Sequence, residues 1–389
     1  MNRKGPVSGI DYFNNLPEPV LKKRRIALIT SSSTVDSTGC PVYIAVGNRA
    51  GRLLTSIWSL QHGFFIDKQD NMILSKSFFW NELGCEVLSL YGVERLPGEE
   101  SLKNIDAILV DVFDVGTRVY TFLNHLVMIM KYLSGKGIDL IILDRPNPLN
   151  GIDHEGNLLD ESHYSMVGML PVPMRHGLTA GEFISMALTH HNIDLNLEIV
   201  KVKGWERRDY FQGIWTYPSP NMPSLSTALV YPGAVLLEAT NISEGRGTTR
   251  PFEFIGSPFL NSRKLIADLK RQKLTGVNFV PGFFKPEFSK YSGEVCQGIL
   301  VVPDNRNDFK CFEVYYEILR LIVNRYPEQF AWNPPPYEFE YERLPIDMIC
   351  GSHVIREALE ADIPFEDINA KIDSDVRFYR ERINDFLLY

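Results

Sequence analysis

Short apolar runs alternate with amphipathic segments through the first 150 residues of the chain. This alternation is typical of parallel strands joined by crossover helices, and it predicts an α/β fold with a Rossmann-like, doubly wound sheet. The segment 115–137 has apolar residues at helical spacing and ends at two glycines, as a helix between two strands should. The expected strands are RIALIT (25–30), RLLTSIWSL (52–60), CEVLSLYG (85–92), AILVDV (107–112) and DLIILD (139–144).

The second half of the chain shows a different pattern of apolar and polar segments. A further strand is expected at 197–205, followed by a Pro-rich stretch, 217–233, that is too interrupted for regular structure and suits a domain junction or binding loop. Beyond about residue 240 the pattern predicts a smaller α+β domain. Its expected elements are a helix at 263–272, strands at 277–288 and 298–304, and a long amphipathic helix at 308–326. A chain of 389 residues is long for one core, so we predict two domains, 22–238 and 239–389.

Composition excludes several classes of protein. A net charge of −8 argues against a nucleic-acid partner, and the basic cluster LKKRR (21–25) is expected to be a solvated flank. Five widely spaced cysteines without a C-x-x-C pair argue against a disulfide framework or a metal site. No apolar run reaches the roughly 18 residues of a membrane span, and no signal peptide is evident. We therefore expect a cytoplasmic protein, or a periplasmic or secreted one if a leader has been removed.

Polar residues cluster where the predicted strands end. Because open parallel sheets bind ligands at the carboxyl ends of their strands, these side chains are expected to share one edge of the sheet. They are Gln61, His62, Tyr91, Asp111, Asp114, Asp144 and Arg145. No G-x-G-x-x-G or G-x-x-x-x-G-K-[ST] turn accompanies them, which argues against a dinucleotide or nucleotide cofactor, and no cofactor is expected.

Five polar segments are candidates for binding: 110–122, 143–151, 173–177, 218–223 and 240–253. Any one of them can be an ordinary turn, but four carry an arginine, whose planar fork suits a carboxylate ligand. Their candidate substrate-binding residues, besides Tyr91, Asp144 and Arg145 above, are Arg118, Tyr120, Asn147, Arg175, His176, Asn221, Asn241 and Arg246. Thr179 and Glu182 have the spacing of a capping box, which favours a structural role for Glu182 over a catalytic one.

Several of these segments belong to a set of longer motifs. They are LQHG, SLYGVERLP, DVFDVGTRVYT, LDRPNPLNG, EGNLLD, VPMRHGLTAGE, YPSPNMPSLSTALVYPG, TNISEGRGTTRPFE and the terminal FLLY. In these motifs, and over its length from about residue 25 to the C-terminus, the chain resembles the exo-β-N-acetylmuramidase (NamZ-type) family of bacterial peptidoglycan-recycling glycosidases. The resemblance implies a substrate cleft between the two domains and removal of a terminal β-linked N-acetylmuramic acid from peptidoglycan fragments. The lactyl carboxylate of that sugar would be a partner for the arginines.

The resemblance fails at one position of chemical importance. The family's usual motif is Pro-Glu-His-Gly, and the resemblance implies that its glutamate is the catalytic acid, whereas this chain has Leu60-Gln61-His62-Gly63. An amide cannot protonate a leaving glycosidic oxygen. One hypothesis is that another acid, Asp111, Asp114 or Glu244, has taken over beside His62, although Asp114 can equally cap the following helix.

Two other hypotheses remain open on the sequence. The protein can be a family member that has lost hydrolysis and binds muropeptide-like sugars, or has drifted to another glycoside, because glutamine keeps the size and hydrogen bonding of glutamate without its acidity. A more remote alternative is a nucleotide-sugar or dinucleotide enzyme, which only the expected sheet topology favours.

Overall fold

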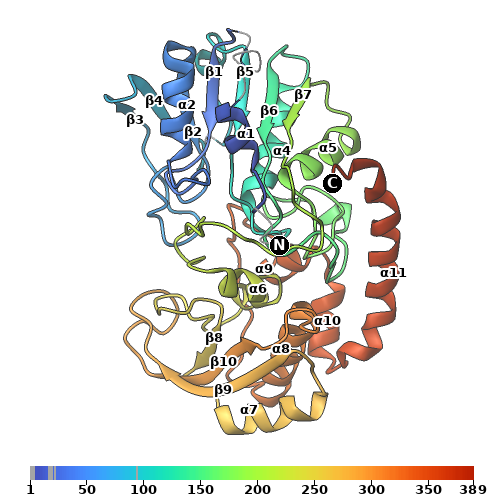
Figure 1. Ribbon diagram of the computed structural model, residues 1–389. Helices are drawn as coiled ribbons and strands as arrows, with labels where there is room; N and C mark the ends of the chain where they lie inside the picture. Colours follow the sequence, from blue (N-terminus) through green and yellow to red (C-terminus); the bar gives the residue numbers. More distant parts are fainter. Residues whose placement is uncertain (1–4, 16–20, 22, 93–94) are drawn as a thin grey trace.

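A seven-stranded sheet forms the core of the N-terminal lobe, which is the upper lobe in Figure 1. The computed structural model describes residues 5–15, 21, 23–92 and 95–389. Neighbouring strands are parallel except for β3, which pairs antiparallel with β4 at one edge. The order across the sheet is β3 (Phe78–Trp80), β4 (Cys85–Ser89), β2 (Leu54–Ser59), β1 (Ile26–Ile29), β5 (Ala107–Val110), β6 (Asp139–Leu143) and β7 (Leu197–Val200).

Helices cover both faces of this sheet, so its strands are apolar on both sides. In β1, Ile26 and Leu28 pack with α1 (Gly9–Asn15) and α2 (Val42–Ala50), whereas Ala27 and Ile29 face the cluster that contains α4 and α5. This two-sided burial explains the continuous apolar runs of the sequence. The doubly wound sheet is therefore confirmed. The connecting helices on this lobe also include the short α3 (Glu99–Leu102), α4 (Thr121–Leu133) and α5 (Ala180–His190).

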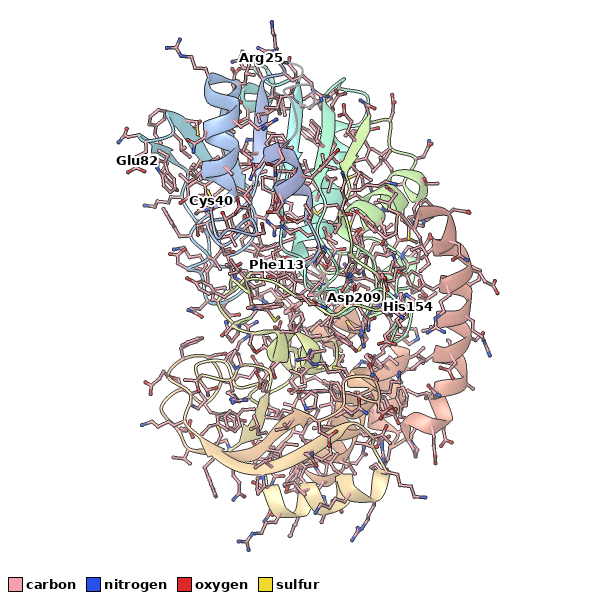
Figure 2. The ribbon with its side chains drawn as sticks, in the orientation of Figure 1. Arg25, Cys40, Glu82, Phe113, His154 and Asp209 are labelled. Atoms are coloured by element: carbon pink, nitrogen blue, oxygen red, sulfur yellow. The ribbon has the colours of Figure 1, made fainter. Side chains whose placement is uncertain are left out.

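The carboxyl ends of the parallel strands face the second lobe. Figure 2 marks Arg25, which precedes β1, at the far end of the sheet and Phe113, which follows β5, near the junction of the lobes. Helix α5 begins with the expected capping box: the Thr179 hydroxyl accepts from the Glu182 amide, and the Glu182 carboxylate accepts from the Thr179 amide. The structural role predicted for Glu182 is confirmed.

The C-terminal lobe is a smaller α+β unit, as predicted. Its antiparallel sheet has the order β8 (Phe254–Ser257), β10 (Cys296–Pro303), β9 (Val277–Phe284). The helices that pack with it or follow it are α6 (Leu225–Ala234), α7 (Ser262–Leu269), α8 (Cys311–Arg325), α9 (Pro345–Cys350) and α10 (Val354–Glu360). The domain bounds at 22–238 and 239–389 stay a prediction, and residue 22 lies outside the described residues.

The chain returns to the N-terminal lobe at its end. Helix α11 (Phe365–Ile383) runs alongside both lobes in Figure 1 and brings the last residues to α5. There the Leu388 amide donates to Glu182 Oε1 (2.9 Å), and the Tyr389 hydroxyl donates to Asp144 Oδ2 (2.6 Å). The two C-terminal residues thus fasten α11 to the carboxyl end of β6.

Two local expectations are wrong. The Pro-rich stretch 217–233 is not irregular throughout, because α6 begins after Ser224, whose hydroxyl accepts from the Thr227 amide, and continues through Pro232. Proline is tolerated there because the surrounding residues are buried, and their packing offsets the lost hydrogen bond. In the cluster 21–25, Arg24 is not a solvated flank but pairs with Asp139 (2.6 Å) and Glu198 (2.9 Å); Lys22 is outside the described residues.

No helix in the described part of the chain is long and apolar enough to cross a membrane.

Candidate active site

A pocket lies between loops of the two lobes, and its outline contains about 460 Å³ of space between protein atoms, part of it open to solvent. The N-terminal lobe contributes the turn after β2, the loop that follows it and the start of α4. The other wall comes from the loop before α6, from α6 itself, and from segments near residues 238–252 and 337–338. The lining residues are Gln61, His62, Asn71, Val119, Tyr120, Thr121, Ser219, Asn221, Met222, Tyr231, Glu238, Arg246, Phe252, Tyr337 and Glu338.

Gln61 is buried at the carboxyl end of β2, where the strand turns at Gly63. Its side-chain oxygen accepts a hydrogen bond from the Thr121 hydroxyl at the start of α4. Its Nε2 donates to Glu338 Oε1 (2.6 Å) and lies 3.3 Å from the Tyr91 hydroxyl. Both ends of the amide are therefore engaged, and Gln61 is held in one orientation.

Glu338 is the carboxyl group in contact with Gln61, and the sequence analysis did not identify it. It is buried, and its Oε2 accepts from the Tyr91 hydroxyl at 2.8 Å. Burial raises the pKa of Glu338 to about 7, with the nearby Glu238 adding to the rise and the bonds from Tyr91 and Gln61 opposing it. Its backbone has φ 48°, a left-handed conformation that is uncommon outside glycine and recurs at functional sites.

His62 lines the pocket in its neutral form. Its Nδ1 lies 2.7 Å from the carbonyl oxygen of Lys68, so Nδ1 carries the proton and Nε2 is left as an acceptor. Burial lowers the pKa of His62 to about 4, with Arg246 lowering it further and the Lys68 carbonyl opposing. At neutral pH this side chain offers the pocket an imidazole rather than a positive charge.

Arg246 is the arginine that lines the pocket, and it is ion-paired with Glu238, with Glu244 and, at 3.9 Å, with Asp70. Its Nη2 lies 2.6 Å from Glu238 Oε1 and its Nε lies 3.2 Å from Glu244 Oε1. Burial on its own would lower the pKa of Arg246, but these carboxylates outweigh it and raise the pKa overall. Glu238 Oε2 also accepts from the Tyr337 hydroxyl (2.8 Å), so both oxygens of its carboxyl group are held at the pocket wall.

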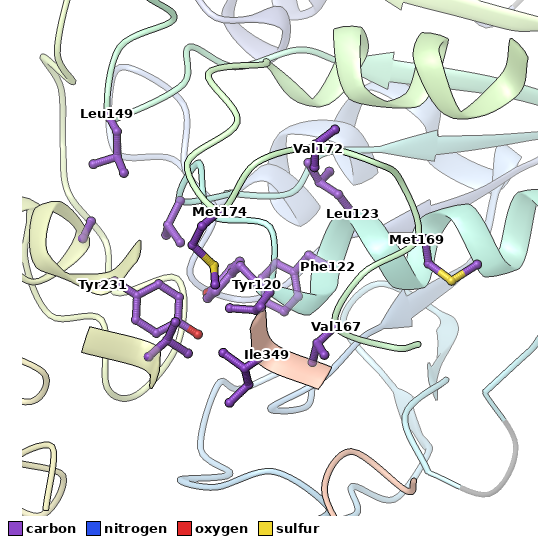
Figure 3. Packing of buried hydrophobic residues seen from close by; sticks show 14 of the residues in the cluster. Tyr120, Phe122, Leu123, Leu149, Val167, Met169, Val172, Met174, Tyr231 and Ile349 are labelled. Carbon is purple, nitrogen blue, oxygen red and sulfur yellow. The ribbon is translucent and has the colours of Figure 1, made fainter. Parts of the chain in front are cut away.

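Aromatic rings form one side of the pocket. The rings of Tyr120 and Tyr231, which lie together in the hydrophobic cluster of Figure 3, have centroids 6.2 Å apart and are perpendicular. Tyr231 in turn packs edge-to-face on Phe252 at 4.8 Å. With the amide of Asn221, which donates to the Gln69 carbonyl oxygen (2.9 Å), they give a site of apolar faces and a few fixed polar groups, as ligand pockets usually have.

The structure brings part of the predicted set together. Gln61, His62, Tyr120, Asn221 and Arg246 line the pocket, and Tyr91 joins it through its bond to Glu338. Within the described ranges, no group of three or more His, Cys, Asp or Glu side chains is arranged to hold a metal ion.

The three candidate acids lie away from the pocket lining. Asp111 is buried and pairs with Arg145 Nε (2.6 Å), which opposes the rise in pKa that burial causes. Asp114 accepts from the Gly116 amide (2.7 Å) and therefore stabilises a turn. It does not cap α4, as the sequence analysis had allowed, because the residue at the start of that helix is Tyr120. Glu244 lies between Arg246 and Lys290, whose Nζ is 2.8 Å from Glu244 Oε2. Both oxygens of the Glu244 carboxyl group are thus engaged by cations, which leaves neither oxygen directed at a substrate.

Two of the predicted arginines hold the fold together. Arg118 is buried and donates to the carbonyl oxygens of Asn157 (2.8 Å), Val172 (2.9 Å), Ile349 (3.0 Å) and Cys350 (2.7 Å). Arg175 pairs with Glu155 (2.7 Å) and with Asp153 (3.2 Å). The Nη atoms of both side chains donate inside the protein and neither residue lines the pocket, so neither is carried into the proposed substrate site.

The remaining candidates also make internal contacts. Asp144 accepts from the Thr179 hydroxyl, the Gly181 amide and the Tyr389 hydroxyl. His176 Nδ1 accepts from the Leu178 amide (3.1 Å), and Asn147 Nδ2 donates to the Leu178 carbonyl oxygen (2.9 Å). Asn241 exchanges hydrogen bonds with Gln329 and Ala331. Arg145, besides Asp111, donates to the Val35 carbonyl oxygen (2.8 Å). These residues shape loops around the sheet edge.

The residues that sequence reasoning missed come from segments without regular periodicity. Glu338 and Tyr337 follow a run of three prolines and make a tight turn closed by paired backbone bonds between Tyr337 and Glu340. Glu238 lies in a 3₁₀ turn at Val235–Ala239, just before the segment that contains Arg246. The sequence did offer one signal, a glutamate between two aromatic residues in a Pro-rich loop. Binding and catalytic residues are often found on loops.

Comparison with known proteins matches the chain over nearly its whole length. The family described as exo-beta-N-acetylmuramidase NamZ, N-terminal, matches residues 26–226, and its C-terminal counterpart matches residues 229–389. The chain is 34% identical over 385 residues to the peptidoglycan beta-N-acetylmuramidase NamZ of Bacillus subtilis (strain 168), which covers 98% of this chain and 91% of that protein.

Two solved structures from Bacteroides fragilis, both DUF1343 family proteins, have the same fold. One superposes with a TM-score of 0.87 at 28% identity and the other with a TM-score of 0.73 at 25% identity, each covering 99% of both chains. Because the two family models together span residues 26–226 and 229–389, the chain belongs to the exo-β-N-acetylmuramidase NamZ family.

Proposed function

We propose that this protein is a glycoside hydrolase that releases terminal N-acetylmuramic acid from the non-reducing end of peptidoglycan fragments, with the pocket at Gln61 as its substrate site. The Bacillus subtilis relative, a peptidoglycan beta-N-acetylmuramidase, supports the substrate class. The observation that carries the proposal is a pair of carboxyl groups, Glu238 and Glu338, on the wall of one pocket. Glycosidases normally use such a pair, so a glutamine at position 61 does not leave the site without an acid.

The shape of the site supports an exo mode of action. The site is a pocket lined by Tyr231, Phe252 and Tyr337, and a pocket accommodates the end of a glycan chain better than its interior, which would need an open groove. The aromatic rings offer apolar faces to a sugar ring, and Asn71, Asn221 and Ser219 offer polar groups to its hydroxyl and acetamido groups.

Arg246 supports the choice of a muramic sugar. A guanidinium has five N–H donors, and the contacts of Arg246 with Gln69, Glu238 and Glu244 occupy three of them. The remaining donors can meet the lactyl carboxylate, although three neighbouring carboxylates, those of Asp70, Glu238 and Glu244, reduce the net positive charge there. The arginines 118, 145 and 175 do not enter this proposal, because their contacts lie elsewhere.

The test is hydrolysis by the purified protein of a chromogenic β-N-acetylmuraminide and of the disaccharide MurNAc-β-1,4-GlcNAc. The matched control is the corresponding β-N-acetylglucosaminide, which lacks only the lactyl ether. We expect release of free MurNAc and little turnover of the control. Absence of MurNAc release from both muramic substrates would overturn the proposal. Calorimetric binding of MurNAc without any turnover would instead favour a protein that binds muropeptide-like sugars and does not hydrolyse them.

A further inference from the structure

We propose that Glu338 is the general acid of this pocket, and that Gln61 and Tyr91 hold it in place. The inference rests on the hydrolase activity proposed above. It gives the role of proton donor to Glu338, because the amide of Gln61 cannot donate a proton to the leaving group. It concerns a residue far from the family motif at 60–63 in the sequence, which the fold brings into direct contact with that motif.

The geometry gives Glu338 a fixed position with free lone pairs. Gln61 Nε2 donates to Oε1 at 2.6 Å and the Tyr91 hydroxyl donates to Oε2 at 2.8 Å. Tyr91 is itself fixed, because its oxygen accepts from the Met72 amide at 2.8 Å. A carboxyl group has about four lone-pair sites, so two donors leave room for a proton on the side that faces the pocket.

The surroundings of Glu338 keep it protonated near neutral pH. Burial is the main cause, and the pKa of about 7 means that a substantial fraction of the group carries its proton at pH 7. The backbone carbonyl of Glu338 accepts from Arg95 Nη2 at 3.3 Å, which anchors this turn to the N-terminal lobe. The titratable and charged groups that face Glu338 are Tyr91, Arg95, Tyr231, Glu238 and Tyr337.

The glutamine at position 61 is suited to this assignment. A glutamate there would place a second carboxyl within hydrogen-bond distance of Glu338, and the two would compete for one proton. With glutamine at position 61, no second carboxyl group competes for the proton, and an uncharged N–H group donates to Glu338 instead. Because Thr121 occupies the oxygen of the Gln61 amide, its nitrogen is directed at Glu338.

The second carboxyl, Glu238, differs from Glu338 in its partners. Glu238 is ion-paired with Arg246 and accepts from Tyr337, whereas the Glu338 carboxyl accepts from the uncharged donors of Gln61 and Tyr91. Two carboxyl groups in one site with different environments can take different roles in acid catalysis.

The proposed step balances with water as the co-substrate. As the bond between C1 and the glycosidic oxygen breaks, its electron pair goes to the oxygen, which takes the proton of Glu338. Water adds to C1 and completes the hydrolysis, and a proton from that water returns to the Glu338 carboxylate. No other reactant is needed.

The experiment compares leaving groups. Aryl β-N-acetylmuraminides with a poor leaving group (phenol) and with an activated one (2,4-dinitrophenol) are hydrolysed by the natural protein, by Glu338→Gln and by the control Glu342→Gln, an exposed carboxylate of the same segment. A general acid typically contributes about 10²- to 10⁴-fold. We expect Glu338→Gln to lose at least about 100-fold in kcat/KM on the phenyl substrate and less than about tenfold on the dinitrophenyl substrate, which needs little protonation.

A second variant protects the test against loss of folding. Tyr91→Phe keeps the ring but removes a bond that lowers the pKa of Glu338, so the fall of kcat/KM above pH 7 should move to higher pH. Equal losses of Glu338→Gln on both leaving groups, or an unshifted profile in Tyr91→Phe, would overturn the assignment of the acid alone. Inactivity of the natural protein on both substrates would overturn the proposed hydrolase function, and the assignment with it.

Discussion

Gln61 Nε2 donates a hydrogen bond of 2.6 Å to Glu338 Oε1, although 277 residues separate the two positions in the chain. The contact joins the turn after β2 to the loop before α9, and so connects the sheet edge with a segment of the C-terminal half. The position at which the family motif has glutamate therefore lies against a buried carboxyl. This relationship explains how a glycosidase pocket can carry an amide at that position and still contain an acid.

Glu338 should make the protein less stable as the pH rises towards 8. Its pKa is about 7 in the folded state against an ordinary 4.5, so the folded state binds more protons between these values. Stability from this group is present below pH 4.5 and is lost as the pH rises through 7. Glu338→Gln removes the effect, and its free energy of unfolding relative to the natural protein should increase by about 3 kcal/mol between pH 4.5 and 8.

Urea unfolding of both proteins at pH 4.5, 6 and 8 measures this difference. Glu342→Gln, which changes an exposed carboxylate, is the control and should show no such trend. A difference between Glu338→Gln and the natural protein that does not vary with pH would mean that Glu338 titrates at its ordinary value.

Arg246 should be needed for stability and for turnover together. Replacement by methionine leaves Glu238 and Glu244 without their shared cation, and removing one partner of a buried ion pair costs about 3–5 kcal/mol. Glu238, the second carboxyl group of the pocket, would also lose the guanidinium that holds its Oε1 in place. We expect a lower midpoint in urea unfolding and a fall in kcat. Lysine at this position should recover little, because it cannot contact both carboxylates with a planar fork.

Arg271→Met is the matched control, since that side chain is 77% exposed and pairs with Asp268. Its loss should stay within about 1 kcal/mol. Similar unfolding curves for the two methionine variants would contradict the role given to Arg246.

The terminal residue, Tyr389, should stabilise the fold in a pH-dependent way. Burial raises the pKa of Asp144 to about 6, and the hydrogen bond from the Tyr389 hydroxyl opposes that rise. Above pH 6 the Asp144 carboxylate is charged and the bond is strong, whereas at pH 4 the carboxyl group is mostly protonated in the folded state and the bond is weaker. Tyr389→Phe should therefore lose about 1.5–3 kcal/mol at pH 8 and less at pH 4. Thermal unfolding at both pH values, with the exposed Tyr341→Phe as control, checks this; an equal loss at both values would refute it.

Arg118 should affect stability and leave substrate binding unchanged. Its guanidinium satisfies four carbonyl oxygens, two of them in α9 or at its end, and burial lowers its pKa to about 10. Arg118→Met would leave these acceptors unpaired, at roughly 1–3 kcal/mol each if water does not replace the donor. We expect reduced stability to urea but an unchanged KM below the unfolding transition. A raised KM with normal stability would instead show that Arg118 takes part in substrate binding.

The sequence predicted the fold well, because strands and helices are marked by the spacing of apolar residues within short segments. Runs such as Ile26–Ile29 are apolar on every residue only when both faces of a strand are covered, so the doubly wound sheet could be predicted from them. The same reasoning placed Gln61 and His62 at the carboxyl edge of the sheet, because they follow β2 directly, and both line the pocket there. The edge strand Phe78–Trp80 was not expected, since three residues show no periodicity.

The site was predicted less completely because its members depend on distant partners. Arg118, Arg145 and Arg175 look alike in the sequence, but carbonyls and carboxylates as much as 232 residues away determine what each one holds. Glu338 has no local signal, because its raised pKa arises from burial against Tyr91 and Gln61 across the fold. Long-range packing thus decides which polar residues face the pocket.

The most direct test of the account is release of free MurNAc from MurNAc-β-1,4-GlcNAc by the natural protein, measured beside Gln61→Glu and Glu338→Gln. The account predicts that the natural protein, with its glutamine, releases MurNAc, and that Glu338→Gln loses this activity. Release by Gln61→Glu alone, with an inactive natural protein, would contradict it.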